Sequence, residues 1–218
     1  MDVVPIIALT MGLAWASGIN LYAAIATLGL LGATGNMVLP PGLEVLQHPA
    51  VIAAAGFMYW VEFFADKAPG VDTGWDTIHT FIRIPSAAIL AAAAVWDVDP
   101  AMALVAGILG GTLGATSHIL KAGTRVVINA SPEPFSNIGA SLFEDTMVLA
   151  GMLGAVFYPV EFLVFAVLFY VAAVWLLPRI WRAVRTLWAR IAGIFSGAGR
   201  PRPQRGRLPA LTMTGRPT

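Results

Sequence analysis

The chain has 218 residues, of which 58% are hydrophobic and only 11% are charged. A soluble domain carries about 25% charged residues, so this composition indicates an integral membrane protein and argues against a soluble globular domain. There are no cysteines, which excludes disulfide bonds, thiolate metal sites and a cysteine nucleophile.

Six apolar segments are long enough to be predicted spans, because a membrane-spanning helix needs about 20 apolar residues. Polar stretches that contain Pro or Gly separate them. In chain order the segments cover residues 4–31, 50–66, 78–97, 101–122, 138–157 and 160–178. The sequence therefore predicts an all-α, polytopic transmembrane helix bundle over residues 1–178. Four spans plus two re-entrant segments fit almost as well.

Charge is distributed unevenly along the chain. Residues 1–178 hold 4 Lys/Arg and all 12 Asp/Glu, whereas residues 179–218 hold 9 Arg and no acid. If six spans are traced back from a cytoplasmic C-terminus, every Lys and Arg lies at or near the cytoplasmic side. We therefore expect a multi-pass protein of the bacterial inner membrane, with both termini in the cytoplasm.

The C-terminal region is expected to form two parts outside the bundle. In residues 179–198, Trp181, Val184 and Trp188 recur at helical spacing among arginines, which is typical of an amphipathic helix on an anionic membrane surface. Residues 199–218 are rich in Pro, Gly and Arg and are predicted to be disordered. A topology anchor is the simplest role for this basic region.

The third span cannot cross the bilayer without charged residues. From Pro85 to Trp96 there are only 12 residues, about 18 Å of helix, against a hydrocarbon core of about 30 Å. This helix must begin near Thr77, which brings His79 and Arg83 into the membrane. The same argument brings polar residues into the ends of the fourth and fifth spans. Ionisable groups at that depth cost about 2.5–3.5 kcal/mol each, so they pair, contact water or bind a ligand.

Helical spacing places these polar residues on shared faces, and we predict one polar pocket that opens toward the cytoplasm. Its candidate residues are Asn20, Glu62, Asp66, Asp72, Asp76, His79, Arg83, Ser117, His118, Lys121, Arg125, Glu144 and Asp145.

Simpler interpretations apply to several of these residues. Lys67, Lys121 and Arg125 lie at span ends, where their side chains can extend to the headgroups. Arg83 with Glu144 or Asp145 can form an internal structural ion pair. Glu144 and Asp145 are adjacent on a helix and point about 100° apart, so they cannot face one partner. One of the two is a candidate proton carrier.

Small residues indicate close helix packing. Residues 107–118 contain two overlapping GxxxG pairs, a spacing that lets helices approach closely. This helix is also one candidate for the contact surface of a homodimer. Residues 80–95 align without gaps with residues 141–156, placing Arg83 opposite Glu144, as a fold of two related halves would.

Four stretches resemble a known family: SGINLYAAIATLGLLG (17–32), LPPGLEVLQHPAVI (39–52), VEFFADKAPGVDTGWDTIHTFIR (61–83) and SHILKAGTRVVINASPEPFSNIGASLFED (117–145). They are similar to the small bacterial membrane proteins grouped as domain-of-unknown-function family 4126. The similarity covers about residues 10–175 and leaves out the Arg-rich tail. It implies a membrane location and no activity.

Three functions follow from these observations. The first is a small transporter whose basic residues hold an anionic or lipid-phosphate group, with proton coupling through Glu144 or Asp145; a version that moves cations through the acidic residues is nearly as well supported. The second is a structural or assembly protein whose buried charges form ion pairs. An intramembrane enzyme acting on a lipid phosphate is a minor third, because no catalytic motif is present.

We expect no cofactor and no nucleic-acid partner. The metal question stays open, and membrane lipids and a second copy of the chain are the expected partners.

Overall fold

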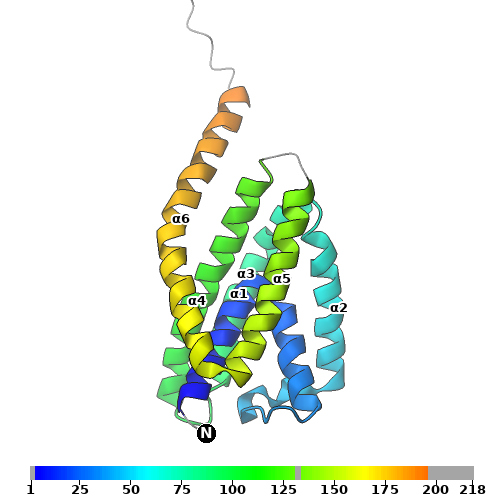
Figure 1. Ribbon diagram of the computed structural model, residues 1–218, viewed down its shortest axis with the longest axis vertical. Helices are drawn as coiled ribbons and strands as arrows, with labels where there is room; N and C mark the ends of the chain where they lie inside the picture. The colour runs from blue at the N-terminus through cyan, green and yellow to red at the C-terminus, as the bar shows by residue number, and fades with distance from the viewer. Residues whose placement is uncertain (1–2, 131–133, 196–218) are drawn as a thin grey trace, which may run out of the picture.

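The computed structural model describes residues 3–130 and 134–195, and every regular element in this part of the chain is a helix (Figure 1). Six long helices run along one axis, with a short 3-10 helix between the first two. Their bounds are α1 (Val3–Ala33), η1 (Pro41–Gln47), α2 (Pro49–Ala65), α3 (Val71–Ala93), α4 (Pro100–Ile128), α5 (Pro134–Phe157) and α6 (Pro159–Phe195). The predicted all-α membrane bundle is confirmed.

Proline sets where four of the helices begin, because it has no N–H to satisfy and its φ suits the first helical turn. α2, α4, α5 and α6 all start at a proline. At α4 the Asp99 carboxylate also accepts hydrogen bonds from the backbone N–H groups of Ala101 (2.6 Å) and Met102 (3.2 Å). These starts agree with the breaks predicted from the sequence.

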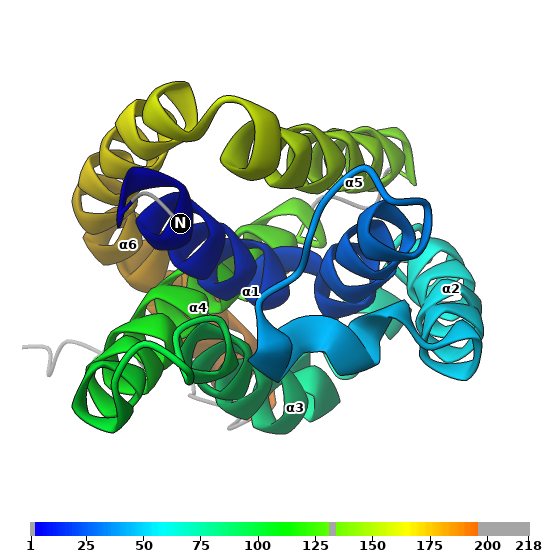
Figure 2. The ribbon, with the colours of Figure 1, turned by 90° about the horizontal axis from the view of Figure 1, so that it is seen from below.

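α1 is interrupted near its middle. Asn20 has φ −147° and ψ 94°, which is not helical. The chain turns back at this residue, so both ends of α1 lie at the same end of the bundle (Figures 1 and 2). Neighbouring contacts agree, because Gly12 lies against Phe162 at the start of α6 and Gly32 lies against Leu39, just before η1. The first predicted span, 4–31, is therefore a re-entrant helical hairpin.

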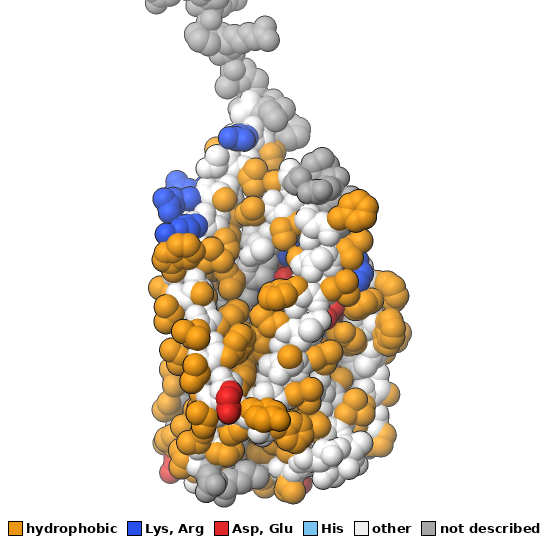
Figure 3. Space-filling view, viewed as in Figure 1, with side chains coloured by type: hydrophobic (Ala, Val, Ile, Leu, Met, Phe, Trp, Pro, Cys, Tyr) orange, Lys and Arg blue, Asp and Glu red, His pale blue; other side chains and the backbone are white. Residues whose placement is uncertain are grey.

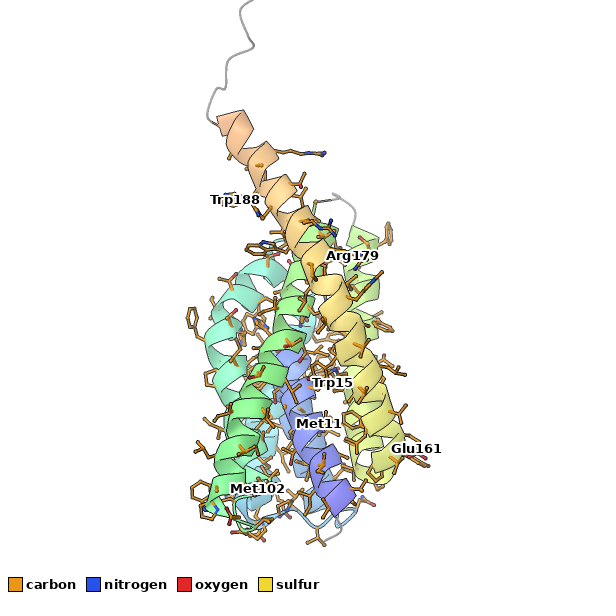
Figure 4. The ribbon with its side chains drawn as sticks, turned by 90° about the vertical axis from the view of Figure 1, so that its left-hand side faces the viewer. Met11, Trp15, Met102, Glu161, Arg179 and Trp188 are labelled. Atoms are coloured by element: carbon orange, nitrogen blue, oxygen red, sulfur yellow. The ribbon has the colours of Figure 1, made fainter. Side chains whose placement is uncertain are left out.

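The hairpin changes the predicted topology. The remaining five helices alternate in direction, so α1 begins at one end of the bundle and α6 ends at the other (Figure 1). The expectation that both termini share one side is wrong for the described residues, because it counted α1 as a crossing. Described Lys and Arg atoms still gather in the upper part of the molecule, while Glu161 lies at the lower end (Figures 3 and 4).

Length and composition distinguish the helices. Four of them, α1, α4, α5 and α6, are long and apolar enough to cross a membrane, and α2 is a shorter apolar helix of 17 residues. α3 begins at Val71, and His79 and Arg83 lie within it as predicted.

α6 continues through Pro178 to Phe195, so the predicted interfacial segment is an extension of the last span. The predicted disordered region 199–218 lies outside the described residues.

The glycines of α4 pack inside the protein. A Cβ added at Gly110 or Gly114 would collide with Ala91 or Ala87 of α3, and the Gly114 position also faces the Ala14 carbonyl of α1. The packing role predicted for the GxxxG spacing is therefore seen within one chain. α1 supplies half of the buried residues of the apolar core, and there Trp15 contacts Phe162, Phe165 and Phe169 of α6.

The hairpin predicts which residues share a membrane side. Because the chain contains no cysteine, single substitutions Val3→Cys, Asn36→Cys and Arg190→Cys report location directly. In intact cells we expect a membrane-impermeant maleimide to label the first two and to leave Arg190→Cys unlabelled until the membrane is opened. Labelling of Val3→Cys and Arg190→Cys from the same side would contradict the hairpin.

Candidate functional site

Charged side chains from four helices meet in the interior beside the break in α1. We call this group the charged cluster. It consists of Glu62 of α2, Asp66 directly after α2, Asp76 and Arg83 of α3, Lys121 and Arg125 of α4, and Glu144 and Asp145 of α5. Seven of the eight residues are at most 5% exposed, and the Glu144 side chain is 12% exposed. These residues therefore meet as a buried network of ion pairs, and the predicted opening of a pocket toward the cytoplasm stays a prediction.

Arg83 joins α3 to α2. Its Nη2 lies 2.5 Å from Glu62 Oε1 and its Nη1 lies 2.9 Å from Asp76 Oδ1. The Arg83 and Glu62 side chains are 0% exposed, so this pair is wholly desolvated. The structural ion pair predicted between Arg83 and Glu144 or Asp145 is not the one that forms, because α3 directs Arg83 toward α2.

Lys121 lies at the centre of the cluster. Its Nζ lies 2.6 Å from Asp66 Oδ2 and 3.4 Å from Glu62 Oε1, and it donates to the Ile19 carbonyl of α1 at 3.0 Å. With its side chain 2% exposed, Lys121 does not extend to the headgroups. The snorkelling interpretation is wrong for this residue because three acceptors hold the ammonium inside.

Arg125 connects α4 with α2 and α5. Its Nη2 donates to Glu144 Oε2 at 2.5 Å, and its Nη1 donates to Asn137 Oδ1 at 2.5 Å and to the Asp66 carbonyl at 3.0 Å. Its side chain is 0% exposed, so the snorkelling interpretation is wrong here as well. Asn137, at the predicted start of the fifth span, was not among the predicted site residues.

The break in α1 supplies polar backbone to the cluster. Asn20 Oδ1 accepts from the Ala23 N–H at 2.9 Å, as an N-cap does for the second half of the helix. Asn20 Nδ2 donates to Asp145 Oδ1 at 3.1 Å. The interruption also exposes the C-terminal end of the first half, which carries partial negative charge, and the Ile19 carbonyl there binds Lys121. Asn20 is a polar residue in an apolar segment, and its side chain is hydrogen-bonded to a buried partner, Asp145.

Lys67 lies just beyond α2, at the edge of the cluster. Its Nζ lies 4.0 Å from Asp145 Oδ2 and donates to Ser141 Oγ at 3.2 Å. Partial burial lowers the pKa of the Lys67 ammonium, and the negative charge of Asp145 opposes that shift. The side chain is 19% exposed, so Lys67 is the cluster's most accessible basic neighbour among the described residues.

The other predicted site residues lie outside the ion-pair network. The Asp72 carboxylate accepts from Asn129 Nδ2 at 2.8 and 2.9 Å and from the Gly70 N–H, so it fixes the start of α3. Ser117 donates to the Leu113 carbonyl of its own helix.

Both membrane histidines have local partners. His79 Nε2 lies 3.1 Å from the Tyr22 hydroxyl, and His79 Nδ1 lies 2.9 Å from the Trp75 carbonyl. His118 Nε2 lies 2.7 Å from Thr80 Oγ1, and its Nδ1 lies 3.4 Å from Arg83 Nη1. His118 therefore borders the cluster, whereas His79 connects α3 to the second half of α1. No group of three or more His, Asp or Glu side chains within the described ranges is arranged to hold a metal ion.

The charged cluster contains more acid than base. Five carboxyl groups face the three basic groups of the cluster and Lys67, which pairs with Asp145 from the edge, a formal charge of −1 if all are ionised. Four buried carboxyl oxygens have no hydrogen-bond partner in the described part of the chain: Glu62 Oε2, Asp66 Oδ1, Asp76 Oδ2 and Asp145 Oδ2. Each of these carboxyl groups accepts a hydrogen bond through its other oxygen, so the second oxygen is a free acceptor for a proton or water. The arrangement is suited to accepting positive charge.

Comparison with known proteins identifies a family and no activity. A family model described as "Domain of unknown function (DUF4126)" matches residues 7–179. No curated protein and no solved structure gives a significant match to the chain. The matched range includes every residue of the charged cluster and ends where the basic extension of α6 begins.

Proposed function

Because this chain belongs to the DUF4126 family of membrane proteins, whose name assigns no activity, we propose its function from the site alone. We propose that the protein is a small membrane transporter in which the charged cluster takes up and releases a proton. The observation that carries this proposal is the excess of buried carboxyl groups, with four of their oxygens unpartnered among the described residues. A proton is the smallest charge that compensates such a group without displacing a neighbour.

The re-entrant hairpin supports the same proposal. Interrupted helices in transporters bring polar backbone groups to the middle of the membrane, where they contact the transported ion or its partners. Here the interruption at Asn20 contacts Asp145 through a side chain and Lys121 through the Ile19 carbonyl. Protonation of Asp145 changes the charge that faces this break, which links proton binding to the position of α1.

An anionic substrate is less well supported than a proton. Arg83, Lys121 and Arg125 each contact at least one carboxylate within 2.6 Å, so an anion must compete with these internal partners. We also propose an orientation. The Lys and Arg side chains gather at one end of the bundle, which supports a cytoplasmic location for that end in a bacterial inner membrane. A homodimer and bound lipids stay predictions.

A structural role is the second candidate, and the closed network favours it. The three basic groups of the cluster connect α2, α3, α4 and α5, and no cluster side chain is more than 12% exposed. Buried charges of this kind can fix which faces of the helices meet. This role predicts a well-folded protein that moves no protons.

Proton flux distinguishes the two candidates. The full chain is reconstituted in liposomes that contain a pH-sensitive dye, and a potassium gradient with valinomycin drives proton entry. We expect Asp145→Asn to reduce the flux to the protein-free rate, because the amide keeps the contact with Asn20 and cannot be protonated. Asp97→Asn, at an exposed carboxylate outside the cluster, is expected to retain the wild-type flux. Wild-type flux equal to that of protein-free liposomes, or unchanged flux in Asp145→Asn, would contradict proton transport.

A further inference from the structure

A pocket between α3, α4 and α6 reaches the charged cluster from the side of the bundle. Its volume is about 270 Å³ and it is open on one side. Figure 4 shows α6 passing α4 in the upper half of the molecule. The polar residues of its wall are Asp76, His118, Thr73, Thr77 and Thr80. The rest is apolar and includes Ile119, Leu177, Ile180, Trp181 and Val184. A pocket with an apolar wall and a few polar groups at one end is typical of a small-molecule site.

Asp76 gives this pocket its charge. Its Oδ1 accepts from Arg83 Nη1 at 2.9 Å and lies 3.9 Å from Lys121 Nζ. Its Oδ2 has no hydrogen-bond partner in the described part of the chain, although the residue is only 1% exposed. Arg83 and Lys121 also contact Glu62 and Asp66, so their positive charge is shared with these two carboxylates and does not belong to Asp76 only. Asp76 therefore lines the pocket and keeps an unused acceptor, Oδ2, buried behind the pocket surface.

We infer that this pocket binds a small organic cation, a protonated amine carried on a short apolar chain or ring. The ammonium group would donate to the Asp76 carboxylate, and the threonine hydroxyl oxygens offer further acceptors. The apolar part would pack against Ile119, Ile180 and Trp181. A carboxylate at the polar end disfavours an anion, and the apolar wall disfavours a hydrated inorganic ion.

A small organic cation would be the class of molecule that the proposed transporter moves. This part rests on the proposed function, in which the charged cluster accepts positive charge. The binding itself is independent of movement across the membrane. A lipid acyl chain could fill the same apolar wall, but it would make no use of the Asp76 charge. A charged ligand and its neutral analogue therefore distinguish the two occupants.

The test is calorimetric titration of the full chain in nanodiscs, with empty nanodiscs subtracted. The probes are phenethylammonium and its neutral analogue 2-phenylethanol. We expect the cation to bind and Asp76→Asn to weaken it by about tenfold or more, since the variant removes a buried charge partner. Asp97→Asn is expected to bind as the wild type does. Equal binding of cation and alcohol, or unchanged binding in Asp76→Asn, would overturn the inference.

A second variant keeps Asp76 and its ion pair in place. Ala122 lies in the pocket wall on α4, so Ala122→Phe fills the cavity and is expected to abolish cation binding without loss of the folded protein. Unchanged binding in Ala122→Phe would also overturn the inference. Cation binding in a protein that shows no proton flux would refute the proposed transport and leave this site intact. Proton flux without cation binding would refute only the site.

Discussion

Replacement of Arg83 by alanine is expected to destabilise the protein by about 3–5 kcal/mol, the cost of breaking a buried ion pair from one side. The variant leaves Glu62 and Asp76 facing each other without the guanidinium, and both side chains are at most 1% exposed. The free energy of unfolding can be measured by titration with sodium dodecyl sulfate in mixed micelles, with helix content as the signal. Arg182→Ala, at an exposed arginine of α6, is the matched control and is expected to change stability by less than about 0.5 kcal/mol.

A charge-compensated variant separates electrostatics from packing. In Arg83→Ala with Glu62→Gln and Asp76→Asn, no unpaired charge remains at this point of the cluster, so we expect most of the lost stability to return. The part of the unfolding free energy that is not recovered measures the cost of the cavity left by the arginine side chain. If Arg83→Ala proves as stable as Arg182→Ala, the ion pair does not hold α3 to α2.

The sequence was sufficient to predict the helices and to predict that charged residues lie inside the membrane-spanning segments. Proline positions placed four helix starts, and α3 was too short without His79 and Arg83 to cross a membrane. Both predictions depend on local properties, namely the chemistry of proline and the rise of a helix per residue. The same reasoning identified all eight residues of the charged cluster before their contacts were known.

The reversal of α1 was not predictable in the same way. An apolar stretch of 31 residues has the length and hydropathy of a span. Its break depends on partners far along the chain: Asp145 binds the Asn20 amide and Lys121 binds the Ile19 carbonyl. Asn20 is a polar residue in an apolar segment, but a single amide in a span does not indicate a turn. The error in topology followed from this one helix.

The choice of ion-pair partners was likewise beyond the sequence. Helical spacing shows which residues share a face, but the rotation of each helix against its neighbours decides which faces meet. Arg83 therefore pairs with Glu62 across α2 and α3, while Glu144 pairs with Arg125. The prediction that Glu144 and Asp145 have different partners is correct, because it follows from the geometry of one helix.

The second large loss of stability is expected from a substitution at the close contact between α1 and α4. A Cβ at Gly18 would meet the Gly114 carbonyl, lie 2.5 Å from Ser117 Oγ and lie 3.0 Å from the His118 backbone nitrogen. Backbone atoms cannot move aside as a flexible side chain can, so Gly18→Leu must push the two helices apart. Overpacking of this kind costs about 1–3 kcal/mol, and we expect the upper end of that range or more.

Gly56→Leu is the matched control for this substitution, because nothing lies within 4 Å of a Cβ added at Gly56 of α2. The same micelle titration is expected to show a large loss of stability for Gly18→Leu and little for Gly56→Leu. Gly18 lies one residue before Ile19, whose carbonyl binds Lys121, so the displaced helix also withdraws an acceptor from the cluster. Equal stability of the two leucine variants would show that α1 does not pack against α4 through backbone contact. The position of the break beside Lys121 would then lack its physical support.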